Sequence, residues 1–219
     1  MRRLGNDYLR TGVLLIVLFG LWTVLIQTVD VQCIGETGTA VGFATLNGWF
    51  HALTGVHMQI YAITDWLGLV PICVCMVFGV LGLVQLIQRK SVLKVDKDII
   101  FLGVYYLLVI FGYLVFEMIP INYRPILIEG RMEASYPSST TLLVASVMPT
   151  LVFQGQRRLQ SKRVKQVICT VTWGFSLFTV IGRLCAGVHW FTDIVGSVLL
   201  SAGLFCLYAA AVLLWGTES

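Results

Sequence analysis

Residues 66–87 read WLGLVPICVCMVFGVLGLVQLI and contain no charged side chain. A helix needs roughly 20 apolar residues to cross the hydrocarbon core of a bilayer, and this stretch satisfies that requirement. Over the whole chain, 58% of the residues are hydrophobic, 12% are charged and the mean hydropathy is +0.87. This composition excludes a water-soluble domain of 219 residues and predicts an integral membrane protein.

Five further apolar stretches flank this one and lack charged side chains. The complete set is 11–29, 66–87, 99–116, 138–153, 167–182 and 194–216. The fourth and fifth are short for a membrane crossing, so we expect flanking residues or neighbouring helices to cover their ends. We therefore predict an all-α fold, with residues 1–219 forming a single domain of six transmembrane helices.

The basic residues predict the orientation of this bundle. Twelve of the fifteen Lys and Arg residues lie before the first stretch or in the segments 89–97 and 157–165. By the positive-inside rule, both termini and these two loops face the cytoplasm of a multi-pass protein of the cell membrane. Insertion alone accounts for these basic loops, so we predict no nucleic-acid partner. The other three, Arg124, Arg131 and Arg183, fall on the outer side.

The first outer loop contains a helical pattern of apolar residues. Residues at helical spacing share one face, namely Trp49, Leu53, Val56, Ile60 and Ile63. This pattern predicts an amphipathic helix that lies on the membrane or caps the outer face of the bundle. Two of the three histidines, His51 and His57, belong to this segment. The histidines are scattered and no Cys/His cluster has ligand spacing, so we predict neither a metal nor a cofactor.

The last outer segment places ionisable residues together. His189 and Asp193 are four residues apart, so on a helix they share one face. The carboxylate then accepts a hydrogen bond from one imidazole nitrogen and leaves the other nitrogen free to attack. A glycine at 187 offers a break that lets Arg183 converge with His189. The alternative is that these three side chains only snorkel or pair at the membrane surface.

The second outer loop ends in a helix-start pattern. Pro137 is followed by Ser138, Ser139, Thr140 and Thr141, which predicts that the fourth span begins here with its free amide groups directed outward. Such a helix end is suited to binding an anion. Of the six cysteines, Cys33 and Cys185 fall near the outer face, and the sequence leaves open whether they form a disulfide.

Together these segments resemble the type-2 phosphatidic acid phosphatase family of membrane lipid phosphatases. That family carries K-x6-R-P, then P-S-G-H, then S-R-x5-H-x3-D. The corresponding residues here are Glu117-x6-Arg124-Pro125, then Pro137-Ser138-Ser139-Thr140, then Gly182-Arg183-x5-His189-x3-Asp193. The third motif is the most specific, and the resemblance covers the second half of the chain by motif.

The resemblance implies a metal-independent mechanism at the outer membrane face. His189 would attack phosphorus to form a phosphohistidine, with Asp193 stabilising the imidazolium. Arg124 and Arg183 would bind the non-bridging oxygens. Ser138 and the amide groups of Ser139 and Thr140 would complete the phosphate site.

Three departures from the family pattern affect the expected activity. Glu117 replaces a lysine, Gly182 replaces a serine, and Thr140 replaces the histidine that protonates the leaving group. A threonine hydroxyl is a poor general acid near neutral pH, which puts a factor of roughly 10² to 10⁴ in rate at risk.

Several alternatives follow from the missing histidine. Another residue could supply the proton, with His57 the first candidate, then His51 and Glu133. The substrate could instead be an isoprenoid-type lipid diphosphate, whose leaving phosphate has a second pKa of only about 6 and needs little protonation. The third alternative is a catalytically impaired protein that binds, transports or senses a lipid phosphate. The oligomeric state stays open.

Overall fold

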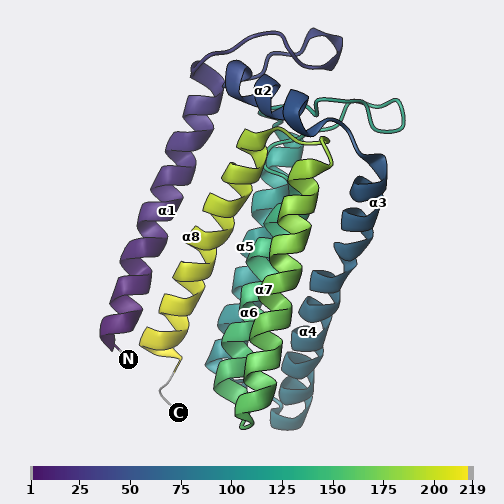
Figure 1. The fold of residues 1–219 in the computed structure, drawn as a ribbon. Helices are drawn as coiled ribbons and strands as arrows, with labels where there is room; N and C mark the ends of the chain where they lie inside the picture. The colour runs from purple at the N-terminus through teal and green to yellow at the C-terminus, as the bar shows by residue number, and fades with distance from the viewer. Residues whose placement is uncertain (1, 217–219) are drawn as a thin grey trace.

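The computed structural model describes residues 2–216 and shows an all-α bundle (Figure 1). The described chain contains eight α-helices and two short 3₁₀ helices, η1 (Glu36–Gly38) and η2 (Val92–Lys94). The α-helices are α1 (Arg2–Thr28), α2 (Ala44–Thr54), α3 (Met58–Leu67), α4 (Leu69–Arg89), α5 (Lys97–Met118), α6 (Ser139–Arg158), α7 (Lys162–Cys185) and α8 (Phe191–Trp215). Both ends of the described chain lie at one end of the bundle, and α2 lies across the other end (Figure 1).

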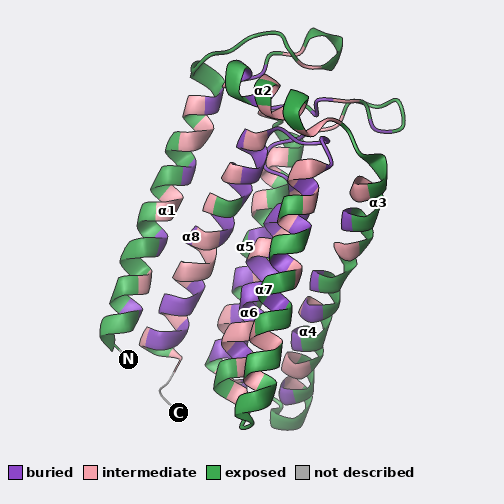
Figure 2. Cartoon of the chain, viewed as in Figure 1, coloured by how far each residue is buried: buried purple, intermediate pink, exposed green. Residues whose placement is uncertain are grey.

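Five helical segments within residues 2–216 are long and apolar enough to cross a membrane. They are α1, α5, α7, α8 and the segment Met58–Arg89, in which α3 continues into α4. The chain is therefore a multi-pass membrane protein. Its apolar side chains are exposed along the outer faces of the bundle, where a bilayer would cover them, whereas buried residues face inward (Figure 2).

The expectation of six spans is confirmed for five of them. Helix α6 has 20 residues and lies within the bundle, but its composition is too polar for it to count as a span. Its polar side chains are buried and hydrogen-bonded to neighbouring helices: Ser146 Oγ donates to Ser201 Oγ at 3.1 Å, and Gln154 Nε2 donates to the Tyr208 hydroxyl at 2.7 Å. Because these partners lie inside the protein, α6 does not need an apolar surface.

The helices extend beyond the apolar stretches at the end of the bundle that carries the termini. Helix α1 begins at Arg2 instead of residue 11, and α7 begins at Lys162 instead of residue 167. Backbone hydrogen bonds continue through charged residues, so the length of an apolar stretch underestimates the length of its helix. At this end Arg158 Nη2 donates to both carboxylate oxygens of Asp98, at 2.8 and 2.9 Å.

The prediction of a single amphipathic helix in the first outer loop is wrong in one respect. The segment forms two helices, α2 and α3, which are separated at Gly55 with φ of +67°. Only α2 lies across the end of the bundle, and α3 joins the membrane-spanning segment that includes α4. The backbone N–H of His57, at the break, donates to Ala186 O at 3.0 Å, so the break attaches this loop to the end of α7.

Candidate active site

The outward-facing motifs converge at the end of the bundle covered by α2. The tight turn between α7 and α8 brings His189 to this place. Its Gly187 has φ of +69°, and a Cβ built there would lie 2.0 Å from Gly55 O, so only glycine fits without displacing the backbone. The predicted break at this glycine is confirmed.

His189 is buried, with 4% of its surface exposed, and both ring nitrogens have defined partners. Nδ1 lies 3.1 Å from Ser135 O, and because a carbonyl only accepts, Nδ1 carries the hydrogen. Nε2 lies 3.3 Å from Arg183 Nη2, which only donates, so Nε2 presents its lone pair. Burial lowers the pKa of His189 well below 6.5, and the nearby charges of Arg124 and Arg183 lower it further. The imidazole is neutral at physiological pH, as a nucleophile requires.

The predicted direct hydrogen bond between His189 and Asp193 is wrong. Helix α8 begins at Phe191, so His189 lies before the helix and does not share a face with Asp193. His189 Nδ1 is 3.9 Å from Asp193 Oδ2, and the Ser135 hydroxyl lies between them. Ser135 Oγ is 3.1 Å from Nδ1 and donates a short hydrogen bond to Asp193 Oδ2. The serine hydroxyl thus links the imidazole to the carboxylate.

The Asp193 carboxylate is fully buried and held by two further donors. The backbone N–H of Trp190 donates to Oδ2 at 2.9 Å, and Asn122 Nδ2 donates to Oδ1 at 3.2 Å. Ser135 lies outside all three motifs and reaches Asp193 only through the fold, so the sequence pattern does not reveal it.

Arg124 and Arg183 lie beside the imidazole and are almost completely buried, at 8% and 1% exposed. Both guanidinium groups lie over the ring of Tyr61, at 5.9 and 4.8 Å from its centroid. Arg124 Nε is 3.1 Å from Glu133 Oε2, an ion pair without hydrogen-bond alignment. Among the described residues, Arg124 Nε and Nη1 and Arg183 Nε have no hydrogen-bond partner. Buried N–H groups without acceptors are costly, and a bound anion would satisfy them.

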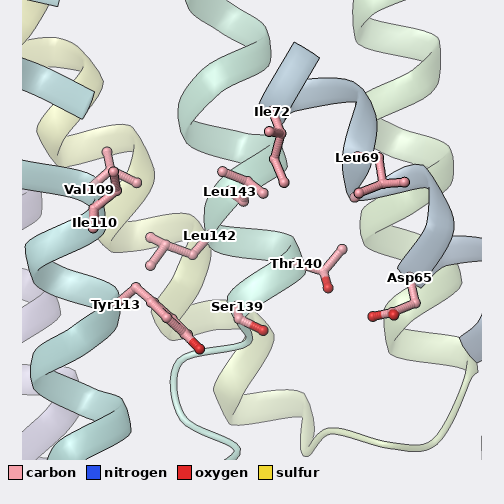
Figure 3. A pocket seen from close by; sticks show the side chains of 11 residues that line it. Asp65, Leu69, Ile72, Val109, Ile110, Tyr113, Ser139, Thr140, Leu142 and Leu143 are labelled. Atoms are coloured by element: carbon pink, nitrogen blue, oxygen red, sulfur yellow. The ribbon is translucent and has the colours of Figure 1, made fainter. Parts of the chain in front are cut away.

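The N-terminus of α6 lies beside an apolar cavity of about 270 Å³. Ser139, Thr140 and Asp65 line one end of this cavity, and apolar residues of α4, α5 and α6 line the rest (Figure 3). Ser138 precedes the helix, and its hydroxyl donates to Thr141 Oγ1 at 3.1 Å, so that hydroxyl is already engaged within the first turn.

The three residues nominated as substitute acids do not line the cavity beside Thr140. His57 Nε2 is hydrogen-bonded to Thr54 O at 2.9 Å, and His51 Nε2 to Gly187 O at 3.1 Å. Neither histidine lines the cavity beside Thr140. Glu133, paired with Arg124, lies instead with Glu117 around an adjoining polar pocket of about 220 Å³, which Ser139 also lines. The carboxylate that does reach the Thr140 cavity is Asp65, which belongs to none of the three motifs.

The structure also bears on the cysteines and on potential metal ligands. Cys33 and Cys185 are free thiols and do not form a disulfide. No group of three or more potential metal-ligating His, Cys, Asp or Glu side chains is present within residues 2–216.

Comparison with known proteins identifies the region that holds this site. Residues 114–216 match the family described as the PAP2 superfamily, and this region contains Arg124, the α6 N-terminus, Arg183, His189 and Asp193. Residues 114–216 belong to the PAP2 superfamily. The resemblance to the type-2 phosphatidic acid phosphatases is thereby confirmed.

A solved structure shares the fold. The crystal structure of the first transmembrane PAP2 type phosphatidylglycerolphosphate phosphatase from Bacillus subtilis matches with a TM-score of 0.63 and 17% sequence identity. The match covers 95% of this chain and 99% of that chain. At this identity the similarity shows a common fold and nothing finer. No curated protein matches the sequence.

Proposed function

We propose that this PAP2 protein is a lipid phosphatase that acts through a phosphohistidine on His189. The observation that carries the proposal is a neutral, buried imidazole whose Nε2 lone pair faces Arg183 Nη2, with the charge of Arg124 nearby and unpaired N–H groups on both buried arginines. A phosphoryl group bound to these arginines would have its phosphorus next to Nε2. Catalysis of this kind depends on positioned donors for the charge on phosphorus.

The first chemical step forms the bond between Nε2 and phosphorus and breaks the bond between phosphorus and the lipid-side oxygen. The imidazole then carries a positive charge, which Asp193 stabilises through the Ser135 hydroxyl. Arg124, Arg183 and the amide groups at the start of α6 bind the non-bridging oxygens. Water hydrolyses the phosphohistidine in the second step and releases phosphate.

The cavity beside Thr140 supports a lipid substrate. Its lining is apolar along Leu69, Ile72, Val109, Ile110, Leu142 and Leu143 and polar only near the phosphate site. We infer that the lipid tail occupies the apolar part, with the leaving oxygen at the polar end. Thr140 lies at that end and is a poor acid, which favours a leaving group that needs little protonation. We therefore propose an isoprenoid-type lipid diphosphate as the preferred substrate.

The charge distribution supports an outer-face location for this chemistry. The segments that carry twelve of the fifteen basic residues lie at the end of the bundle with the chain termini, opposite α2 and the site. We propose that this basic end faces the cytoplasm. Product phosphate would then leave to the exterior.

The test is phosphate release by the purified protein in detergent, with an isoprenoid diphosphate and phosphatidic acid compared side by side. We expect release that disappears in His189→Ala and is faster for the diphosphate. Arg131→Ala is the matched control, because this outward arginine is exposed and lies outside the site. Faster hydrolysis of phosphatidic acid would refute the substrate preference.

A second function is favoured by the replacements at Glu117 and Thr140. An anion site that keeps its arginines but lacks the usual acid could bind a lipid phosphate without turnover. Lipid binding by the purified protein, with no release from either substrate, would favour this binding, transport or regulatory role.

A further inference from the structure

We propose that the Asp65 carboxylate is the general base that activates water for hydrolysis of the phosphohistidine. The proposal rests on the function proposed above for His189. It assigns a catalytic role to a residue of α3, which lies outside residues 114–216 and outside all three motifs.

Asp65 and the nucleophile His189 contact different terminal nitrogens of one guanidinium group. Arg183 Nη1 is 3.5 Å from Asp65 Oδ1, and Arg183 Nη2 is 3.3 Å from His189 Nε2. A phosphoryl group held by Arg183 therefore has the imidazole on one side and has the carboxylate within reach. The Asp65 side chain is 57% exposed, so water has access to it.

The direction of attack places the water near Asp65. Displacement at phosphorus is in line, so the leaving oxygen lies opposite Nε2 during the first step. Since the lipid tail occupies the apolar cavity, the leaving oxygen lies at the polar end formed by Asp65, Ser139 and Thr140. The water of the second step must attack opposite the bond to Nε2, from the position that the leaving oxygen vacated.

Asp65 is the one carboxyl group among the described residues that line this cavity. Figure 3 shows its carboxylate directed toward Thr140, the position where the family has histidine. A base must lie within hydrogen-bond reach of the proton that it removes. The carboxylate meets this requirement for a water bound at the polar end of the cavity.

A second departure from the family pattern brings Asp65 to this position. A Cβ at Gly182 would lie 2.7 Å from Thr64 Cγ2, so the serine of the family motif would require the Thr64 side chain or α3 itself to shift. Thr64 is fully buried and precedes Asp65, just as Gly182 precedes Arg183. The glycine thus permits the close helix contact that holds Asp65 beside Arg183. The replacement of the family serine by Gly182 and the position of the Asp65 carboxylate are therefore structurally linked.

The proposed step balances in atoms and charge. The water oxygen forms a bond to phosphorus, and one water proton passes to the Asp65 carboxylate. The bond between phosphorus and Nε2 breaks, and its electron pair returns to the imidazole. Phosphate leaves with the second water proton, and Asp65 releases its proton to solvent.

The test separates the two chemical steps by rapid quench of the purified protein with an isoprenoid diphosphate. Asp65→Asn should still release one equivalent of isoprenoid monophosphate per enzyme in a burst. Its steady-state rate should fall by about 10²- to 10⁴-fold, because only the second step loses its base. An acid-labile, alkali-stable phosphoenzyme should accumulate. Asp65→Glu keeps a carboxylate and should recover part of the steady-state rate.

The controls distinguish failure of this proposal from failure of the proposed function. Glu129→Gln removes an exposed carboxylate of an outer loop and should leave the burst and the steady state unchanged. Loss of the Asp65→Asn burst, unchanged turnover, or absence of recovery in Asp65→Glu would each refute the role of Asp65 as base. A wild-type protein without a phosphoenzyme that depends on His189 would instead refute the proposed function, and this proposal with it.

Discussion

Replacing Ser135 by alanine tests the link between His189 and Asp193. The substitution removes the hydroxyl that contacts Nδ1 at 3.1 Å and donates to Asp193 Oδ2, but it keeps the backbone carbonyl that fixes the tautomer. A hydrogen bond to a charged group contributes about 1.5–3 kcal/mol. If that contribution is made in the transition state, kcat falls by about 10- to 150-fold. Asp193→Ala removes the charge itself and should cost more.

The assay is steady-state phosphate release in detergent, with Ser146→Ala as a matched control. Ser146 is also fully buried, and its hydroxyl donates to Ser201 at 3.1 Å, away from the site. Both variants lose a buried hydroxyl, but only Ser135→Ala should lose rate. A wild-type kcat in Ser135→Ala, together with an inactive Asp193→Ala, would show that the carboxylate acts on the imidazole without the serine.

Three further predictions concern packing, substrate choice and pH. Gly182→Ser restores the family residue, but the serine side chain collides with Thr64. Thermal unfolding should therefore show a free energy of unfolding lower by about 1–3 kcal/mol. A wild-type melting temperature would contradict the packing argument. Adding Thr64→Ala should recover part of that loss. Thr140→His restores the family acid and should raise the rate on phosphatidic acid, relative to the rate on a diphosphate, by up to about 10²-fold. An unchanged ratio of the two rates would contradict the role assigned to Thr140. The pKa of buried His189 lies well below 6.5 in the folded protein. Above pH 6.5 neither the folded nor the unfolded state binds the proton, so the stability contribution of His189 is complete. As the pH falls toward the folded-state pKa this contribution is lost, because the unfolded state is protonated first. The melting temperature of wild-type protein should therefore fall more than that of His189→Asn between about pH 7 and 5.5, and equal falls would contradict a depressed pKa.

Much of the fold could be predicted because hydropathy reports lipid contact directly. The apolar stretches correspond to five helices that qualify as membrane spans, whereas α6 differs because its side chains contact other helices. The two-helix structure of residues 44–67 was not predicted, since the apolar pattern continues through Gly55 while the backbone does not.

The site was predicted only as far as local motifs extend. The sequence predicts that Arg124, Arg183 and His189 lie on the same side of the bundle, and the structure places them together. Ser135 and Asp65 could not be found in this way. Asp65 is 118 residues from Arg183 in the chain, and the packing of α3 against α7, which includes the contact between Thr64 and Gly182, places the two side by side. The catalytic roles of these residues stay predictions until the variants are measured.

The polar character of α6 has a consequence for how the protein enters the membrane. A helix with buried polar groups such as Thr150 and Gln154 partitions poorly into lipid by itself, because those groups would have no partners there. The partners of Ser146 and Gln154 are Ser201 and Tyr208 on α8, which is synthesised later. Only residues 159–161 separate α6 from the apolar helix α7. Stable insertion of α6 therefore depends on the chain that follows it. The helices of this half of the protein accordingly insert cooperatively and not one at a time.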